Sequence, residues 1–154
     1  MRITSVSPFS HCILGATGPG AGWRQRPSLE EVRAFILDWY QCIDEHVPVA
    51  LLLSRLAKGD LVLKFPDQTI QSAVAFRDWY AKLCSPDLSV KHEVSDLQIS
   101  WDRTMGYGAE CLVHQRLTES NGKVKNQRLK AHWQLRVSAL GTIEVTRCVV
   151  TRLA

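Results

Sequence analysis

The sequence predicts an α+β fold in which three N-terminal helices pack on one face of an antiparallel sheet. Three segments before about residue 85 have apolar residues at helical spacing, and from about residue 89 onward apolar residues alternate with polar ones, as in half-buried strands. Helices that precede a run of consecutive strands are typical of an α+β domain. The 154 residues, of which 45% are hydrophobic and 22% charged, suit one globular domain with its own core.

The first helix is expected to begin at Ser28. Ser28 and Glu31 form a capping-box pattern directly after Pro27. The apolar stripe that follows consists of Leu29, Val32, Phe35, Ile36, Trp39 and Ile43. Residues three and four apart lie on one side of a helix, so this stripe should face the core.

Two further helices and a short strand are predicted before residue 85. Pro48 suits the first turn of a short helix, and Gly59 can adopt the left-handed conformation that follows a helix end. Residues 61–65 form a short apolar strand stopped by a proline. The third helix covers about residues 71–84 and is broken by Pro86.

Four β-rich segments complete the chain, with turn residues at 121–122 and 140–141. They lie near residues 89–102, 105–119, 125–138 and 142–153. In the third segment Leu129, Ala131, Trp133, Leu135 and Val137 share one parity, and Arg128, Lys130, His132, Gln134 and Arg136 share the other. Because side chains alternate across a strand, we expect Trp133 and Leu135 to be buried and Arg128 and Arg136 to be more exposed.

Composition makes several kinds of protein improbable. The net charge of +4 is spread along the chain without a basic stripe, so no nucleic-acid partner is expected. The longest apolar run, residues 47–53, is too short to span a membrane. The five cysteines show no metal-ligand spacing and no histidine pair accompanies them, so we expect reduced thiols in a cytoplasmic protein, with no metal and no cofactor.

Residues 1–27 are expected to be a flexible extension, and residues 28–154 the folded domain. The glycine-rich run at 15–22 invites comparison with a phosphate-binding loop. A P-loop ends in Lys-Ser or Lys-Thr and opens directly into a helix. Here no such lysine follows, and Pro27 and Ser28 intervene before the first helix.

Several short patterns carry a family resemblance over about residues 28–153. They are Val32-x-x-Phe35-Ile36-x-x-Trp39-Tyr40 leading to Asp44, Phe65-Pro66, Phe76-Arg77-Asp78-Trp79-Tyr80, His92-x-Val94, His132-Trp133 and Gly141-x-Ile143. The chain resembles the nuclear transport factor 2-like superfamily, and within it the SnoaL-like and ketosteroid-isomerase-like proteins. The resemblance implies a strongly bent sheet, a cone-shaped α+β barrel with an apolar pocket, and a homodimer through the outer sheet face.

The residues that a ketosteroid-isomerase-like site needs are absent at the matching positions. Phe65 stands where that family has its carboxylate base, and Trp39, beside Tyr40, stands where it has a helix-one tyrosine. Ala131 replaces its protonated aspartate. The resemblance therefore argues against steroid isomerisation by that route.

His92 and Arg147 are the candidates with chemistry of their own. His92 shares parity with Val90 and Val94, whereas the apolar residues from 97 onward have the opposite parity, which predicts a β-bulge near residues 95–96. As a pocket residue His92 would act as acid or base; the alternative is a hydrogen-bonded histidine at the sheet margin.

Arg147 has the parity of Val145 and Val149, so we expect it to point inward. A buried guanidinium needs an anion, which would be either a bound ligand or a helix-one carboxylate, Asp44 or Glu45.

The pocket wall is predicted from the remaining inward residues. The ligand-binding candidates are Arg147, Trp39, Tyr40, Phe65, Trp101, Cys111 and Trp133. For the aromatic residues the alternative is plain core packing. Cys111 has no activating group beside it, so it would line the pocket without acting as a nucleophile.

Two functions remain open at this point. In the first, the protein binds a small hydrophobic or acidic molecule and could be an isomerase, cyclase or dehydratase that works by proton transfer. In the second, it is a non-catalytic module that dimerises or binds a protein through its sheet. The lone inward arginine favours the first, and the lack of inward carboxylates favours the second.

Overall fold

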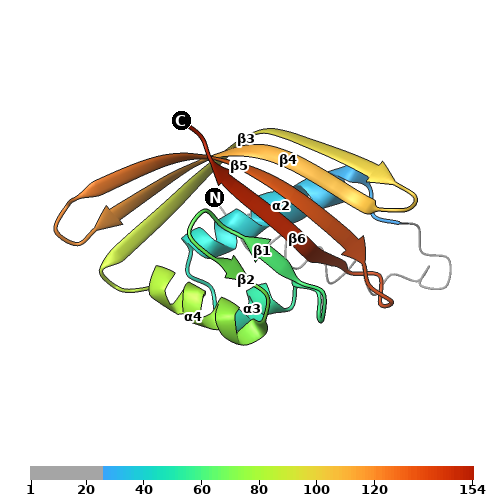
Figure 1. The fold of residues 1–154 in the computed structure, drawn as a ribbon, viewed down its shortest axis with the longest axis horizontal. Coiled ribbons are helices and arrows are strands. Elements are labelled where there is room, and N and C mark those ends of the chain that lie inside the picture. The colour runs from blue at the N-terminus through green and yellow to red at the C-terminus, as the bar shows by residue number, and fades with distance from the viewer. Residues whose placement is uncertain (1–25) are drawn as a thin grey trace, which may run out of the picture.

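The computed structural model describes residues 26–154, so the predicted extension lies outside the described residues apart from Arg26 and Pro27. The elements are α2 (Leu29–Asp44), α3 (Val49–Leu53), β1 (Val62–Lys64), β2 (Thr69–Ile70), α4 (Ala73–Leu83), β3 (Leu88–Asp102), β4 (Gly106–Glu119), β5 (Val124–Val137) and β6 (Ile143–Arg152). The described helices all lie on one side of a strongly curved sheet (Figure 1). This is the α+β class that the sequence predicts.

The helix boundaries follow from their caps. The Ser28 hydroxyl accepts the backbone N–H of Glu31 at 3.1 Å, and the Glu31 carboxylate accepts the Ser28 N–H, which confirms the capping box. Pro48 directly precedes α3. Helix α4 begins two residues later than predicted because Ser72 is its cap and accepts the N–H of Ala75.

The sheet has the strand order β2-β1-β6-β5-β4-β3. Neighbours among the four long strands pair antiparallel, as predicted. The sheet is mixed, however, since β1 pairs parallel to β6. The edge strand β2 was not predicted, because two residues are too few to show an alternating pattern.

Two β-bulges reset which residues face inward. The first lies between Ser95 and Gln98, where Asp96 has a φ of 51°, and it confirms the bulge that the sequence predicts. The second was not predicted. Gln134 pairs with Arg147 while Leu135 pairs with Val145, so Thr146 is an extra residue in β6.

The second bulge makes the prediction for Arg147 wrong. Val145 and Cys148 are both buried, so odd-numbered residues face the core before the bulge and even-numbered residues face it after the bulge. Arg147 is therefore exposed on the outer face, opposite Gln134. Asp44 does not serve as its partner but bonds to His92. The ligand-orienting role of Arg147 depended on inward parity and is withdrawn.

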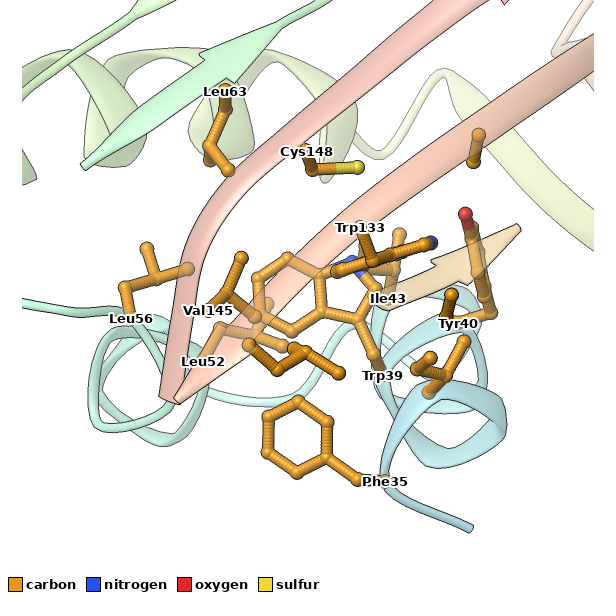
Figure 2. Close-up of a cluster of buried hydrophobic side chains, with 14 of the residues drawn as sticks. Phe35, Trp39, Tyr40, Ile43, Leu52, Leu56, Leu63, Trp133, Val145 and Cys148 are labelled. Atoms are coloured by element: carbon orange, nitrogen blue, oxygen red, sulfur yellow. The ribbon is translucent and has the colours of Figure 1, made fainter. Parts of the chain in front are cut away.

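The core lies between α2 and the inner face of the sheet. Trp39 packs between the rings of Phe76 and Trp133, at centroid distances of 6.0 and 5.9 Å. Figure 2 shows Phe35 and Trp39 of α2 beside Leu52 and Val145. Trp133 and Leu135 are buried and Arg128 and Arg136 are exposed, as predicted.

A buried ion pair ties α3 to α2. Arg55, just after α3, places a guanidinium nitrogen 2.7 Å from Asp38 of α2, and both side chains are more than nine-tenths buried. The Cys42 thiol also contacts this carboxylate, at 3.6 Å. None of the helices in residues 26–154 is long and apolar enough to cross a bilayer.

Candidate functional site

A cavity of about 270 Å³ opens between α2, α4, the β1–β2 turn and the inner face of the long strands. Its wall is mainly apolar and includes Trp39, Ile43, Leu63, Phe65, Trp79, Leu83, Leu88, Val113, Leu117, Leu129, Trp133, Cys148 and Val150. Its polar residues are Tyr40, Asp67, Gln68, His92, Gln115, Lys125, Gln127 and Arg152. Apolar walls with a few polar groups are typical of sites for small molecules.

Five predicted site residues line this cavity: Trp39, Tyr40, Phe65, His92 and Trp133. The other three, Trp101, Cys111 and Arg147, are not among its lining residues. Trp101 is 40% exposed near the β3–β4 turn, where the Arg26 guanidinium lies 3.8 Å from its ring centre. Cys111 does point inward, but it is fully buried in the core.

His92 is held by Asp44, the last residue of α2. The His92 Nδ1 lies 2.6 Å from Asp44 Oδ1, and the His92 backbone N–H donates to Oδ2 at 3.0 Å. The His92 side chain is only 6% exposed and the Asp44 side chain 13%. A carboxylate that accepts both N–H groups fixes the ring in one orientation, which is how histidine bases are commonly positioned.

A chain of polar side chains runs from His92 across the inner face of the sheet. Gln115 Nε2 lies 3.1 Å from His92 Nε2, and Gln127 Nε2 donates to Gln115 Oε1 at 3.1 Å. Arg152 Nε donates to Gln127 Oε1 at 3.0 Å, and a second guanidinium nitrogen lies 3.6 Å from Asp67. The chain thus links strands β3, β4, β5 and β6.

Sequence reasoning missed these residues, although part of the signal is present. Gln115 has the parity of Val113 and Leu117, and Gln127 has the parity of Leu129, so both could have been placed inward. Arg152 could not, because the unpredicted bulge decides the parity of the end of β6.

Charge concentrates where the cavity opens to solvent. Lys125, Asp67, Gln68 and Arg152 are exposed lining residues, in contrast to His92 and Trp133. Asp67 neutralises one of the two cations, so the opening keeps a net positive charge. Among the described residues, no cluster of histidine, cysteine and carboxylate side chains could hold a metal ion.

Two polar aromatic side chains, Tyr40 and Trp133, lie together in the cavity wall. Trp133 Nε1 is buried and makes no hydrogen bond of good geometry within the described residues, but the Tyr40 hydroxyl and the Cys111 thiol both interact with it. In Figure 2 the Trp133 ring lies beside Tyr40, and the ring centroids are 5.9 Å apart. Burial raises the pKa of the Tyr40 hydroxyl well above its usual 10.0, so Tyr40 stays protonated and acts as a neutral donor.

Burial also makes Cys111 a poor nucleophile, because it raises the pKa of the thiol from 9.0 to about 11. In the unfolded chain this thiol ionises near pH 9.0, whereas the folded protein keeps it neutral to about pH 11. The stability it contributes is therefore complete below pH 9.0 and is lost as the pH rises to about 11.

Between pH 9.0 and about pH 11 the wild type should lose about 2–3 kcal/mol more of its unfolding free energy than Cys111→Ala does. The measurement is urea unfolding across the same pH interval. A variant that loses stability as steeply as the wild type would contradict this assignment.

Comparison with known proteins finds no matching protein-family model and no matching curated protein sequence. Solved structures do match, at low identity. ActVI-ORFA from Streptomyces coelicolor matches with a TM-score of 0.67 at 13% identity, covering 80% of this chain and 95% of that one. A putative scytalone dehydratase from Novosphingobium aromaticivorans matches with a TM-score of 0.68 at 11% identity, covering 82% and 84%.

The beta subunit of the benzoate 1,2-dioxygenase from Burkholderia mallei also matches, with a TM-score of 0.68 at 11% identity. That match covers 84% of this chain and 93% of the subunit. Similarity at this level of identity establishes a shared fold and leaves the activity to be argued from the site.

Proposed function

We propose that this chain, which has the nuclear transport factor 2-like fold, binds a small, largely apolar molecule in its cone and moves a proton on it. The observation that carries the proposal is His92, which lines a mainly apolar cavity and whose side chain, only 6% exposed, is held by Asp44 behind it. An isomerase, cyclase or dehydratase that works by proton transfer needs such a group to take the proton. The putative scytalone dehydratase among the similar structures supports the same choice.

His92 is the residue that accepts the proton. With Nδ1–H donated to Asp44, the second ring nitrogen, Nε2, carries the lone pair. When Nε2 takes a proton from a C–H group, the ring becomes positively charged, and the adjacent Asp44 carboxylate stabilises that charge. The proton can then return to another atom of the ligand.

Hydrogen–deuterium exchange at an activated C–H bond tests the proposal without knowledge of the natural ligand. β-Tetralone is a suitable probe, because it is a small apolar ketone with acidic hydrogens beside its carbonyl. We expect the wild-type protein to accelerate their exchange in deuterated buffer, followed by NMR. His92→Gln should lower the acceleration by about 10²–10⁴-fold.

The matched control for His92→Gln is His132→Gln, on the exposed outer face of β5. It should exchange β-tetralone as fast as the wild type. If the wild-type protein does not accelerate exchange, or if both variants retain it equally, the assignment of His92 as a base is wrong.

An acidic group on the ligand would bind at the cavity opening, beside Arg152 and Lys125. Two probes of nearly equal shape test this, anilinonaphthalene sulfonate, an anion, and neutral N-phenylnaphthylamine. We expect Arg152→Met to weaken binding of the anion at least tenfold, measured by probe fluorescence, and to change binding of the neutral probe little.

Arg147→Met, on the same strand but on the outer face, is the matched control and should bind both probes like the wild type. Equal losses of both probes in Arg152→Met would show that the residue shapes the cavity without selecting for charge.

The alternative function is a symmetric homodimer, or a protein-interaction module, that uses the outer sheet face. No described helix covers that face of the four long strands, which supports this alternative (Figure 1). The homodimer predicts twice the monomer mass in sedimentation at micromolar concentration, and a monomer at that concentration would contradict the homodimer. A cytoplasmic location belongs to the same set of proposals, and four free thiols among the described residues support it.

A further inference from the structure

The hydrogen-bond chain that ends on His92 has a direction, because Arg152 stands at its other end. A guanidinium group only donates hydrogen bonds. Whatever faces Arg152 Nε at 3.0 Å must therefore be an acceptor, and on Gln127 that atom is the carbonyl oxygen Oε1.

Each later link follows by elimination. Since Oε1 of Gln127 faces Arg152, its NH₂ group points to Gln115 and donates to Oε1 of that residue at 3.1 Å. Gln115 must then turn its own NH₂ group toward His92, where its Nε2 lies 3.1 Å from the ring Nε2. An N–H group that faces Nε2 is satisfied only if Nε2 carries a lone pair.

Asp44 acts on the ring from the opposite side. Its carboxylate accepts from Nδ1 at 2.6 Å, so Nδ1 carries a proton in either charge state of the ring. The charged side chains bordering the second depression beside His92 are Asp44 and Glu45 of α2 and Lys91 of β3. The Gln115 N–H group opposes a proton on Nε2.

We propose that Arg152 acts through Gln127 and Gln115 as a positioning residue that keeps Nε2 of His92 free of a proton and the ring neutral until Gln115 releases the Nε2 lone pair to a ligand. This inference rests on the proposed function only in calling His92 a base. The direction of the chain is a property of the protein without any ligand.

The arrangement also couples proton removal to the ligand. Nε2 has a single lone pair, so the Gln115 N–H group must leave it before Nε2 can take a proton, and that N–H group then needs another acceptor. Gln115 lines the cavity, so an oxygen atom of the ligand can take that N–H group. Proton removal is thereby favoured for ligands that carry an oxygen acceptor near the acidic C–H bond.

Nitrogen-15 NMR of the ligand-free, full-length protein tests the proposal, because the shift of a histidine nitrogen reports whether it bears a proton. The His92 signals are assigned by their loss in His92→Gln. At neutral pH we expect an unprotonated Nε2 in the wild type and a partly protonated Nε2 in Arg152→Met. Gln115→Glu, which presents only acceptors to the ring, should give a fully protonated Nε2.

Gln127→Leu interrupts the chain at its middle and should match Arg152→Met, so a folding defect in one variant leaves a second test. Arg147→Met, on the outer face of β6, should keep the wild-type signals. A protonated Nε2 in the wild type overturns the proposal. The proposal is also overturned if Arg152→Met and Gln127→Leu are both folded and both show the wild-type signals.

The outcome is separable from that of the proposed function. If the NMR shifts are as expected but the protein does not accelerate β-tetralone exchange, the proton-transfer function is refuted and the role of the hydrogen-bond chain stands. Exchange by the wild type together with unchanged Nε2 signals in the variants would refute only the role of Arg152.

Discussion

Asp44→Asn is expected to reduce the acceleration of β-tetralone exchange by about 10²–10⁴-fold. The asparagine amide keeps the size of the side chain but loses the charge that stabilises a protonated His92. It can also turn its NH₂ group toward Nδ1, which would stabilise the tautomer with the proton on Nε2 and remove the basic lone pair. The measurement is the exchange rate by NMR, normalised to folded protein.

Glu45→Gln is the matched control, since it removes a carboxylate from the next residue. Glu45 is exposed, and among the described residues it makes no hydrogen bond to His92. It should retain wild-type exchange. Equal rates in Asp44→Asn and the wild type would mean that Asp44 only anchors β3 to the end of α2, through the His92 backbone N–H.

The second large effect concerns stability and the buried ion pair. Asp38→Leu is expected to lower the free energy of unfolding by about 3–5 kcal/mol, because it leaves the Arg55 guanidinium, 6% exposed, without the carboxylate now 2.7 Å away. The measurement is urea unfolding at neutral pH.

The double variant Asp38→Leu/Arg55→Met should recover most of that loss, since a buried ion pair and an apolar pair of similar volume differ little in stability. Glu30→Gln removes an exposed carboxylate from the same helix and should cost less than about 1 kcal/mol. A double variant as unstable as Asp38→Leu would show that shape, and not charge, accounts for the loss.

Local patterns in the sequence were enough to predict most of the fold. The capping box at Ser28 fixed the start of α2, because a cap depends only on residues three apart. The alternation in residues 125–138 correctly placed Trp133 inward and Arg136 outward, because no bulge separates them within β5. The bulge near Asp96 was also predictable, since the apolar parity changes within β3 itself.

The parallel pairing of β1 with β6 was beyond such patterns. Its partners, such as Val62 and Arg147, are about half the chain apart, and three residues of strand carry no mark of direction. The same is true of the pairing of Asp38 with Arg55, which depends on how α3 packs against α2.

The candidate site was only partly determined by the sequence. Parity placed His92 and Trp133 on the inner face, and both line the cavity. Three features of the site depend on tertiary structure. They are the partner of His92, the direction of the hydrogen-bond chain through Gln115 and Gln127, and the fact that Arg152, not Arg147, is the inward arginine. A single extra residue, Thr146, turns the end of β6 over, and whether a strand accepts that residue is decided by its neighbour across the sheet.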